Sequence, residues 1–386
     1  MQDAYFLYHS IGQYPGKEAD LVRAMTEFAA VWGAANDSQW GWVLARRAAF
    51  IDRWRGILNA PEGSVTTAEN VTQAVHMLLT ALPPERLRGK RVLVAADCFP
   101  SNHFLLAKLQ ERLGFTLDTV AMRQGAAWVE DEDFIAQWGP DVALAILTWV
   151  SSTTSRRIDL APLVAHGRQM GSIIGVDITQ GAGLMPFDVM APEVDFAVST
   201  SLKWMCGTPG AGILHVAPRL IPDCAPELRG WFSQSDPFSW ALDRFAYAPD
   251  IRRFDNGTPG CVAAITSLPA MDWHAAQDGQ AILAQNRRQT ARIIAAARDM
   301  GLDLVTPEPR PPAPPGEAML RLSGNRHHRQ GRGPADRRIA APRQEGLTPD
   351  RPDDRGPPGA PWIAARAGKS ARAEHLAVDL AARALR

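Results

Sequence analysis

The run VDFAVSTSLKWMCGTPG, residues 194–210, contains the pattern on which the expected fold rests. Its first residues, Val194 to Val198, form an apolar, strand-like stretch, and its last residues form a Gly/Pro turn. Lys203 lies between the two, after small hydroxyl residues and before Trp204. Most lysines are solvated at the surface, and that is the alternative for Lys203. Its neighbours instead indicate a partly enclosed site, in which a lysine can form an imine.

A second strand-like stretch, Ile173 to Val176, ends at Asp177, 26 positions before Lys203. A carboxylate at one strand end and a lysine just past the next strand are what pyridoxal phosphate (PLP) chemistry requires. The lysine forms a Schiff base with the cofactor, and the carboxylate keeps the pyridine nitrogen protonated. The alternative for Asp177 alone is a carboxylate that caps the next turn. The small residues at 178–183 would let a planar ligand approach the backbone.

The middle of the chain alternates between strand and helix patterns, which predicts an α/β fold with a largely parallel sheet and helices on both faces. Ligands bind such sheets at the carboxyl ends of the strands. Phe99, Val150, Asp177 and Lys203 all follow such ends, so we expect them to converge. The expected strands are 91–95, 116–120, 142–147, 172–177, 195–199 and 212–216, and the expected helices are 104–113, 132–138 and 160–170.

Helical spacing also appears on both sides of this region. The expected segments are an arm over the first twenty residues, helices over 21–32 and 45–58, a helix that starts at 66–70 and continues to Pro83, and a helix over 273–299.

A chain of 386 residues is long for one hydrophobic core. Thirteen of its thirty prolines lie between Pro307 and Pro361, a stretch too poor in apolar residues to offset its ordering entropy. A shifted reading frame in the coding DNA would produce such a tail, and we keep this as a hypothesis. The expected division is an arm and first helix (1–30), a large PLP-binding domain (31–272), a helix leading to a small domain (273–306), an Arg/Pro/Gly-rich irregular or disordered segment (307–361) and a C-terminal helix (362–386).

Composition narrows the class of protein. The formal net charge is zero and no apolar run reaches about 18 residues, so neither nucleic acid nor membrane is an expected partner. The four cysteines are scattered without a CxxC pair, which argues against a metal site and indicates a reducing cytoplasm. The N-terminus lacks a signal-peptide pattern. We therefore expect a cytoplasmic protein with no metal. The small amino-acid substrate that we also expect follows from PLP chemistry and not from composition.

Other motifs suit the remaining parts of the cofactor. A phosphate needs a helix N-terminus or a glycine turn, and Asn70-Val71-Thr72 and 256–260 offer these. An ordinary N-cap and a simple turn are the alternatives. Phe99, in the run FPSNH at 99–103, has the flat ring that stacks on an aromatic cofactor, and Trp231 follows Gly230 in a Gly-Trp-Phe segment. For both rings the alternative is a place in the core.

Taken together in this order, these motifs make residues 65–275 resemble the fold-type I PLP enzymes of aminotransferase class V, and most of all the kynureninases. The matching runs are FPSNH at 99–103, GWF at 230–232 and RFDNGTP at 253–259. The resemblance implies a mainly parallel seven-stranded sheet flanked by helices. It also implies a small C-terminal domain, which is abnormal or disordered in this chain.

The resemblance also implies roles for single residues. Lys203 is the catalytic Schiff-base lysine, and Asp177 is the partner of the pyridine nitrogen. The loop that carries Thr258 reaches the phosphate of the neighbouring subunit, so a homodimer is implied. The implied cofactor-binding residues are Asn70, Val71, Thr72, Phe99, Asp177, Gln180, Thr200, Lys203, Trp231 and Thr258.

The resemblance implies hydrolytic cleavage of kynurenine to anthranilate and alanine, a step of tryptophan catabolism. Two positions depart from the kynureninase pattern: Leu202 stands where Tyr is typical, and Gln180 where His is usual. The arginine that binds the substrate carboxylate cannot be placed in this tail. Two alternatives therefore stay open: a class V aminotransferase or C–S lyase resembling the cysteine desulfurases, and a degenerate, non-catalytic paralogue.

Overall fold

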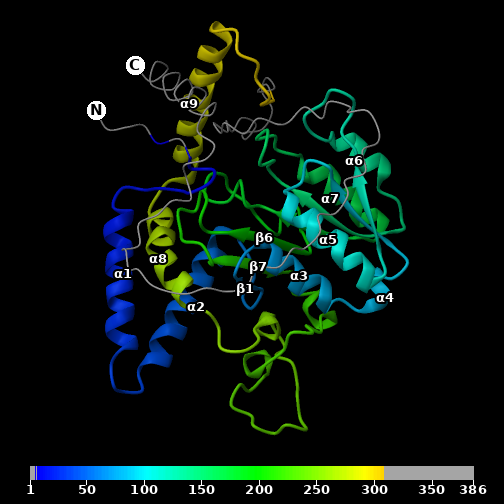
Figure 1. The fold of residues 1–386 in the computed structure, drawn as a ribbon. Coiled ribbons are helices and arrows are strands. Elements are labelled where there is room, and N and C mark those ends of the chain that lie inside the picture. The colour runs from blue at the N-terminus through cyan, green and yellow to red at the C-terminus, as the bar shows by residue number, and fades with distance from the viewer. Residues whose placement is uncertain (1–4, 6, 308–386) are drawn as a thin grey trace, which may run out of the picture.

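A seven-stranded sheet forms the centre of the computed structural model, which describes residue 5 and residues 7–307 (Figure 1). The strand order is β1-β7-β6-β5-β4-β2-β3. β7 runs antiparallel to both of its neighbours, and the other adjacent pairs are parallel. The predicted mainly parallel α/β fold is therefore confirmed. The strands are β1 (Val65–Ala68), β2 (Arg91–Ala95), β3 (Thr116–Val120), β4 (Val142–Thr148), β5 (Ile173–Asp177), β6 (Phe196–Thr200) and β7 (Gly212–Val216).

Helices cover both faces of the sheet and bury two apolar cores. Successive strand residues point to opposite faces, so Val92 and Val94 enter one core and Leu93 the other. α3 and α5 pack over the first core, and α2, α6, α7 and α8 over the second. The helices are α1 (Lys17–Trp32), α2 (Gln39–Ile57), α3 (Val71–Ala81), α4 (Pro84–Leu87), α5 (Pro100–Leu113), α6 (Asp131–Gln137), α7 (Leu160–Met170), α8 (Val262–Ala275) and α9 (Gly279–Asp299), with short 3₁₀ turns η1 (Ile221–Asp223), η2 (Trp231–Ser233) and η3 (Ile251–Phe254).

Six of the seven strands match the expected ranges to within one residue at each end, but β1 was not expected. Residues 66–70 were predicted to begin a helix, and this is wrong. Thr66 and Thr67 pair with Leu214 and Ile213 of β7, where β-branched side chains fit well. The helix begins only after Asn70, whose extended backbone and side-chain bond to the Gln73 amide (2.9 Å) form its N-cap.

The single helix expected over 273–299 is two helices, so that prediction is also wrong. α8 begins at Val262 and tolerates Pro269 in its interior, and it ends before Asp278. The Asp278 side chain accepts bonds from the Gln280 and Ala281 amides and so starts a new helix, α9. α1, α2 and α8 lie side by side, while α9 extends away from the sheet (Figure 1).

The predictions for 308–361 and 362–386, including the reading-frame hypothesis, lie outside the described residues. Within the described part of the chain, no helix is long and apolar enough to cross a membrane.

Candidate active site

A cavity of about 820 Å³ opens at the carboxyl ends of β4, β5 and β6, beside the first turns of α3 and α5. This is the edge at which parallel sheets bind ligands. The cavity gathers eight of the ten residues that the sequence predicted to hold the cofactor. They are Asn70, Val71, Thr72, Phe99, Asp177, Gln180, Thr200 and Lys203.

Lys203 and Phe99 face each other across the cavity. The Lys203 ammonium lies 5.1 Å from the centre of the Phe99 ring. Phe99 precedes α5, and 40% of its surface is exposed, so this ring is not a core residue. A flat ligand joined to Lys203 would have an aromatic face close to it.

Asp177 ends β5 and is only 5% exposed. One carboxylate oxygen accepts a bond from the Asn102 amide (3.1 Å), and the other accepts one from the Thr179 backbone N–H (3.0 Å). These donors fix the orientation of a buried charge. Asn102 was not singled out from the sequence. Its position three residues after Phe99, within the FPSNH run and on the first turn of α5, was the available signal.

Gln180 is locked by three hydrogen bonds. Its Nε2 donates to Ser152 Oγ (3.2 Å) and to the carbonyl of His9 (3.3 Å). Its Oε1 accepts from the indole N–H of Trp204 (3.2 Å). The amide thus joins the loop after β5, the N-terminal arm and the Lys203 segment.

Another part of the cavity wall is formed by the start of α3, where Asn70, Val71 and Thr72 lie. The first backbone N–H groups of a helix have no partner within the helix and carry a partial positive charge. Such an end binds phosphate.

Three threonine hydroxyls in the cavity wall have no hydrogen-bond partner among the described residues: Thr148, Thr179 and Thr200. Buried hydroxyls are nearly always hydrogen-bonded, so these atoms are suited to a polar ligand. A planar group with a phosphate, a ring nitrogen and a phenolic oxygen matches this donor set. The residues present therefore fit PLP.

Trp231 and Thr258 do not line this cavity. Trp231 packs against Trp40, Phe232 and Phe238, with ring centres 4.4–6.3 Å apart. Thr258 borders a second hollow of about 360 Å³. The site residues expected from the sequence thus lie in three places in one chain, and their roles stay predictions.

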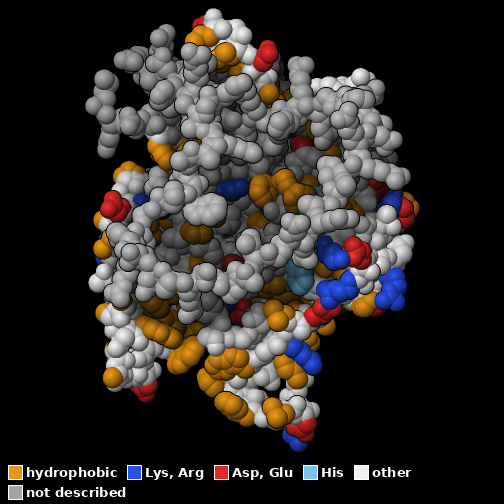
Figure 2. All heavy atoms as spheres, in the orientation of Figure 1, with side chains coloured by type: hydrophobic (Ala, Val, Ile, Leu, Met, Phe, Trp, Pro, Cys, Tyr) orange, Lys and Arg blue, Asp and Glu red, His pale blue; other side chains and the backbone are white. Residues whose placement is uncertain are grey.

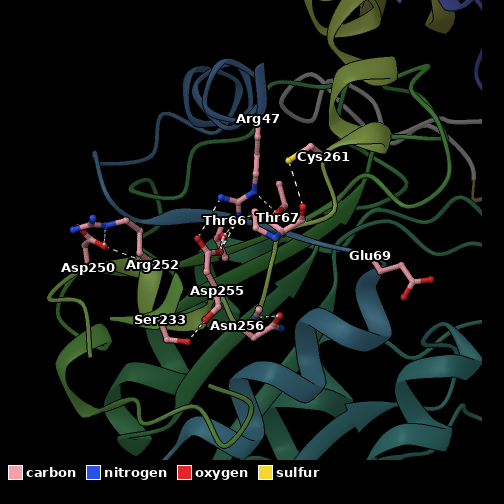
Figure 3. Close-up of polar contacts among 12 residues, drawn as sticks. Arg47, Thr66, Thr67, Glu69, Ser233, Asp250, Arg252, Asp255, Asn256 and Cys261 are labelled. Carbon is pink, nitrogen blue, oxygen red and sulfur yellow. Dashed lines mark hydrogen bonds and ion pairs between the residues drawn. The ribbon is translucent and has the colours of Figure 1, made fainter. Parts of the chain in front are cut away.

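A buried ion pair anchors the Thr258 loop (Figure 3). Arg47 on α2 makes two bonds to the carboxylate of Asp255, at 2.7 and 3.2 Å, and the two side chains are 10% and 7% exposed. Thr66 donates to the same carboxylate (2.6 Å), and Thr67 accepts from Arg47 (2.8 Å). The loop is therefore tied to α2 and β1.

All four cysteines are buried and free of disulfides. Burial raises the pKa of Cys98 and Cys224 to about 12 and that of Cys206 to about 11, and it also raises the pKa of Cys261. At neutral pH these groups are thiols rather than reactive thiolates.

The fold and this site define an enzyme that uses PLP. Residues 52–308 match the family model for aminotransferase class V, which covers more than half of the chain, so the chain belongs to that family.

The similar curated proteins include kynureninases. The one from Deinococcus radiodurans is 32% identical over 48% of this chain and 43% of the relative. The one from Yarrowia lipolytica is 27% identical over 54% and 50%, and the one from Xanthomonas euvesicatoria pv. vesicatoria is 25% identical over 83% and 79%. The chain thus matches about half the length of the first two relatives and about four fifths of the third.

Solved structures share the fold. The apo cysteine desulfurase from Thermococcus onnurineus has a TM-score of 0.70 at 18% identity, covering 79% of this chain and 76% of that one. A variant of C-DES with glycine covalently linked to its PLP cofactor has a TM-score of 0.68 at 20% identity, covering 77% and 78%. At sequence identities this low, the similarity shows a shared fold and nothing further.

Proposed function

We propose that this enzyme hydrolyses a carbon–carbon bond of kynurenine and releases anthranilate and alanine. The observation that carries the proposal is the similarity to kynureninases from three organisms, one of which spans 83% of this chain. The cavity supports it, because its wall includes apolar side chains suited to an aromatic ring. These are Leu105, Val150, Leu202 and Pro209.

In this proposal each residue of the cavity has a separate task. Lys203 would hold the cofactor and, when its amine is free, would move the proton at the α-carbon of the substrate. Asp177, held by Asn102 and Thr179, keeps the ring nitrogen protonated. Bound PLP supplies an electron sink for the charge that develops on the substrate. Phe99 would lie against one face of the cofactor ring, and the start of α3 would bind its phosphate.

The main alternative is another reaction of the same family: amino transfer or C–S cleavage. Gln180 and Leu202, which depart from the kynureninase pattern, favour it. A cysteine desulfurase needs a mobile nucleophilic cysteine, and the four buried thiols with raised pKa values argue against that branch. Amino transfer is then the stronger competitor. The degenerate paralogue is the third candidate, and it would fail to bind PLP.

The test is a product analysis of the full chain loaded with PLP. L-kynurenine is added with and without pyruvate, and anthranilate is followed by its fluorescence. We expect anthranilate and alanine without any keto acid. Lys203→Ala should abolish the reaction, whereas Lys108→Ala, at a side chain on α5 that is 77% exposed, should keep it. Amino transfer to pyruvate without anthranilate would establish the aminotransferase alternative instead.

We also propose that the chain forms a homodimer. Thr258 lines the second hollow and not the large cavity of its own chain, as expected if its loop serves a neighbouring one. The segment at 234–247 carries three large apolar side chains that are 74–101% exposed: Phe238, Trp240 and Leu242. Figure 2 shows apolar side chains gathered where this segment projects at the bottom of the molecule. Such patches are typical of protein interfaces.

A further inference from the structure

We propose that residues 7–17 act as a clamp that positions the Lys203 loop for cofactor binding, with Gly12 and Lys17 as its positioning residues. The inference rests on the proposed role of Lys203. The arm crosses directly over residues 202–207, although it lies about 190 positions away along the chain. Its contacts are to the backbone on both sides of Lys203.

Gly12 is the tightest of these contacts. Its N–H donates to the carbonyl of Leu202 (2.9 Å). A Cβ at this position would lie 1.9 Å from the Lys203 carbonyl oxygen and 2.9 Å from Cys206 Cα. Both neighbours are backbone atoms that cannot yield without moving the loop. Only glycine therefore allows the arm to lie this close to Lys203.

Lys17, at the other end of the arm, joins the arm to the end of the Lys203 loop. Its ammonium donates to the carbonyl of Gly12 (2.7 Å) and to that of Gly207 (3.3 Å). One charged group thus joins the arm to the end of the Lys203 loop. Burial lowers the pKa of Lys17. Bonds from a charged donor to carbonyls are among the stronger hydrogen bonds.

The loop under the clamp is strained. Cys206 has a φ of +59°, the left-handed region that non-glycine residues rarely adopt. Its N–H bonds to the Lys203 carbonyl (2.8 Å), so Lys203 and Cys206 close one tight turn. The Cys206 thiol contacts the carbonyl of Gln13 (3.4 Å). Strained backbone persists only where its surroundings hold it, and here the arm supplies those surroundings.

Two further contacts link the arm to the cavity wall. The carbonyl of His9 accepts a bond from Gln180, and the Tyr8 ring stacks on Trp204 at 6.3 Å and 14°. Displacement of the arm would thus remove one of the three hydrogen bonds of Gln180 and the ring contact of Trp204, as well as the support of the strained turn. The clamp is expected to set the position of the Lys203 amine and hence its chemistry with the cofactor.

The first test compares Gly12→Ala with Gly41→Ala. Gly41 lies in α2 with no atom within 4 Å of an added Cβ, so it is a matched control. PLP affinity and the pH midpoint of the bound-cofactor absorbance are measured on the full chain. The labelling rate of Cys206 is measured on the cofactor-free protein by mass spectrometry. For Gly12→Ala we expect PLP affinity to fall by about tenfold, equal to ~1.4 kcal/mol, with a shifted midpoint and faster labelling.

The second test, Lys17→Met against Lys108→Met, does not depend on the folding of the glycine variant. Lys17→Met keeps a linear side chain and removes only the charged donor. We expect a smaller shift in the same three measurements. A purely structural role would lower the melting temperature but leave the pH midpoint unchanged.

The inference is overturned if both variants keep the wild-type pH midpoint, whatever happens to their melting temperature and PLP affinity. The failure of the proposed role of Lys203 would look different. In that case Lys203→Ala itself would keep the absorbance of lysine-bound PLP. If Lys203→Ala loses that absorbance while both arm variants behave as wild type, only the clamp is wrong.

Discussion

At the scale of single residues, the proposed chemistry depends on the environment of Asp177. Its carboxylate is buried and accepts one bond from Asn102 and one from the Thr179 backbone, so it stays in one place. Asp177→Asn keeps the shape and removes the charge. Because bonds to charged groups contribute up to ~3 kcal/mol, turnover should fall by about 100-fold.

Steady-state kinetics with saturating PLP check this prediction. Asp272→Asn is the control, because Asp272 is 51% exposed and lies outside the cavity. Wild-type turnover in Asp177→Asn would contradict the role assigned to Asp177.

A second residue-scale prediction concerns His215, which is buried in β7. Burial lowers its pKa from the ordinary 6.5 to about 4. The unfolded chain therefore binds more protons between these values, and stability falls as the pH drops from about 6.5 to about 4. Of the stability lost between pH 7.5 and pH 5, ~2 kcal/mol should come from His215.

Urea unfolding of wild type and His215→Gln at both pH values measures this. The variant should lose less stability on acidification than the wild type. Equal losses would mean that the folded protein protonates His215 normally.

At the same scale, the sequence could assign residues at strand ends to one shared site. It could not show whether residues on other segments serve the cavity of their own chain or that of a neighbouring chain. Phe99, Asp177 and Lys203 meet because parallel strands end at one edge. Trp231 and Thr258 lie on segments without regular strands, and short motifs do not reveal which cavity such segments serve. The bond from Asn102 to Asp177 joins residues 75 positions apart, so it became visible only in the fold.

At the scale of elements, the pair of Arg47 and Asp255 ties α2 to the segment after η3. Removing one partner of a buried ion pair leaves the other charge uncompensated, at a cost of about 3–5 kcal/mol. Asp255→Ala should therefore destabilise the protein by about that amount. Asp272→Ala breaks the pair of Arg53 and Asp272, which is half exposed, and should cost less than ~1 kcal/mol.

Chemical unfolding at neutral pH compares the two variants. Equal losses of stability would show that the buried pair is worth no more than a surface pair.

Helices and strands with a strong hydrophobic pattern could be predicted from the sequence. A strand that forms only because it pairs with a distant strand could not. Strands β2, β3 and β7 have the bounds that the sequence indicated, because each is a five-residue run that contains β-branched residues. β1 has only four residues and two threonines, so its strand state depends on pairing with β7. α8 was missed because Pro269 reads as a helix breaker, although the helix continues through it.

At the scale of the whole molecule, the exposed segment at 234–247 decides the expected assembly. A homodimer that buries Phe238, Trp240 and Leu242 would remove a large apolar surface from water. Trp240→Ser combined with Phe238→Ser should raise the dimer dissociation constant by about tenfold or more, since each buried aromatic contributes over ~1 kcal/mol. Phe104→Ser, on α5 at 71% exposure, is the control.

Light scattering over a dilution series measures the molar mass. A wild-type mass of one chain at every concentration would rule out the dimer. An unchanged dissociation constant in the double variant would place the interface elsewhere.

The most direct measurement asks which lysine holds the cofactor. The full chain is loaded with PLP, reduced with borohydride so that the bond becomes permanent, digested and mapped by mass spectrometry. The chain has four other lysines, Lys17, Lys90, Lys108 and Lys369, which serve as internal controls. We predict that the cofactor mass appears on the peptide that contains Lys203. Its appearance on another lysine, or on none, would contradict the assignment of this cavity as the active site.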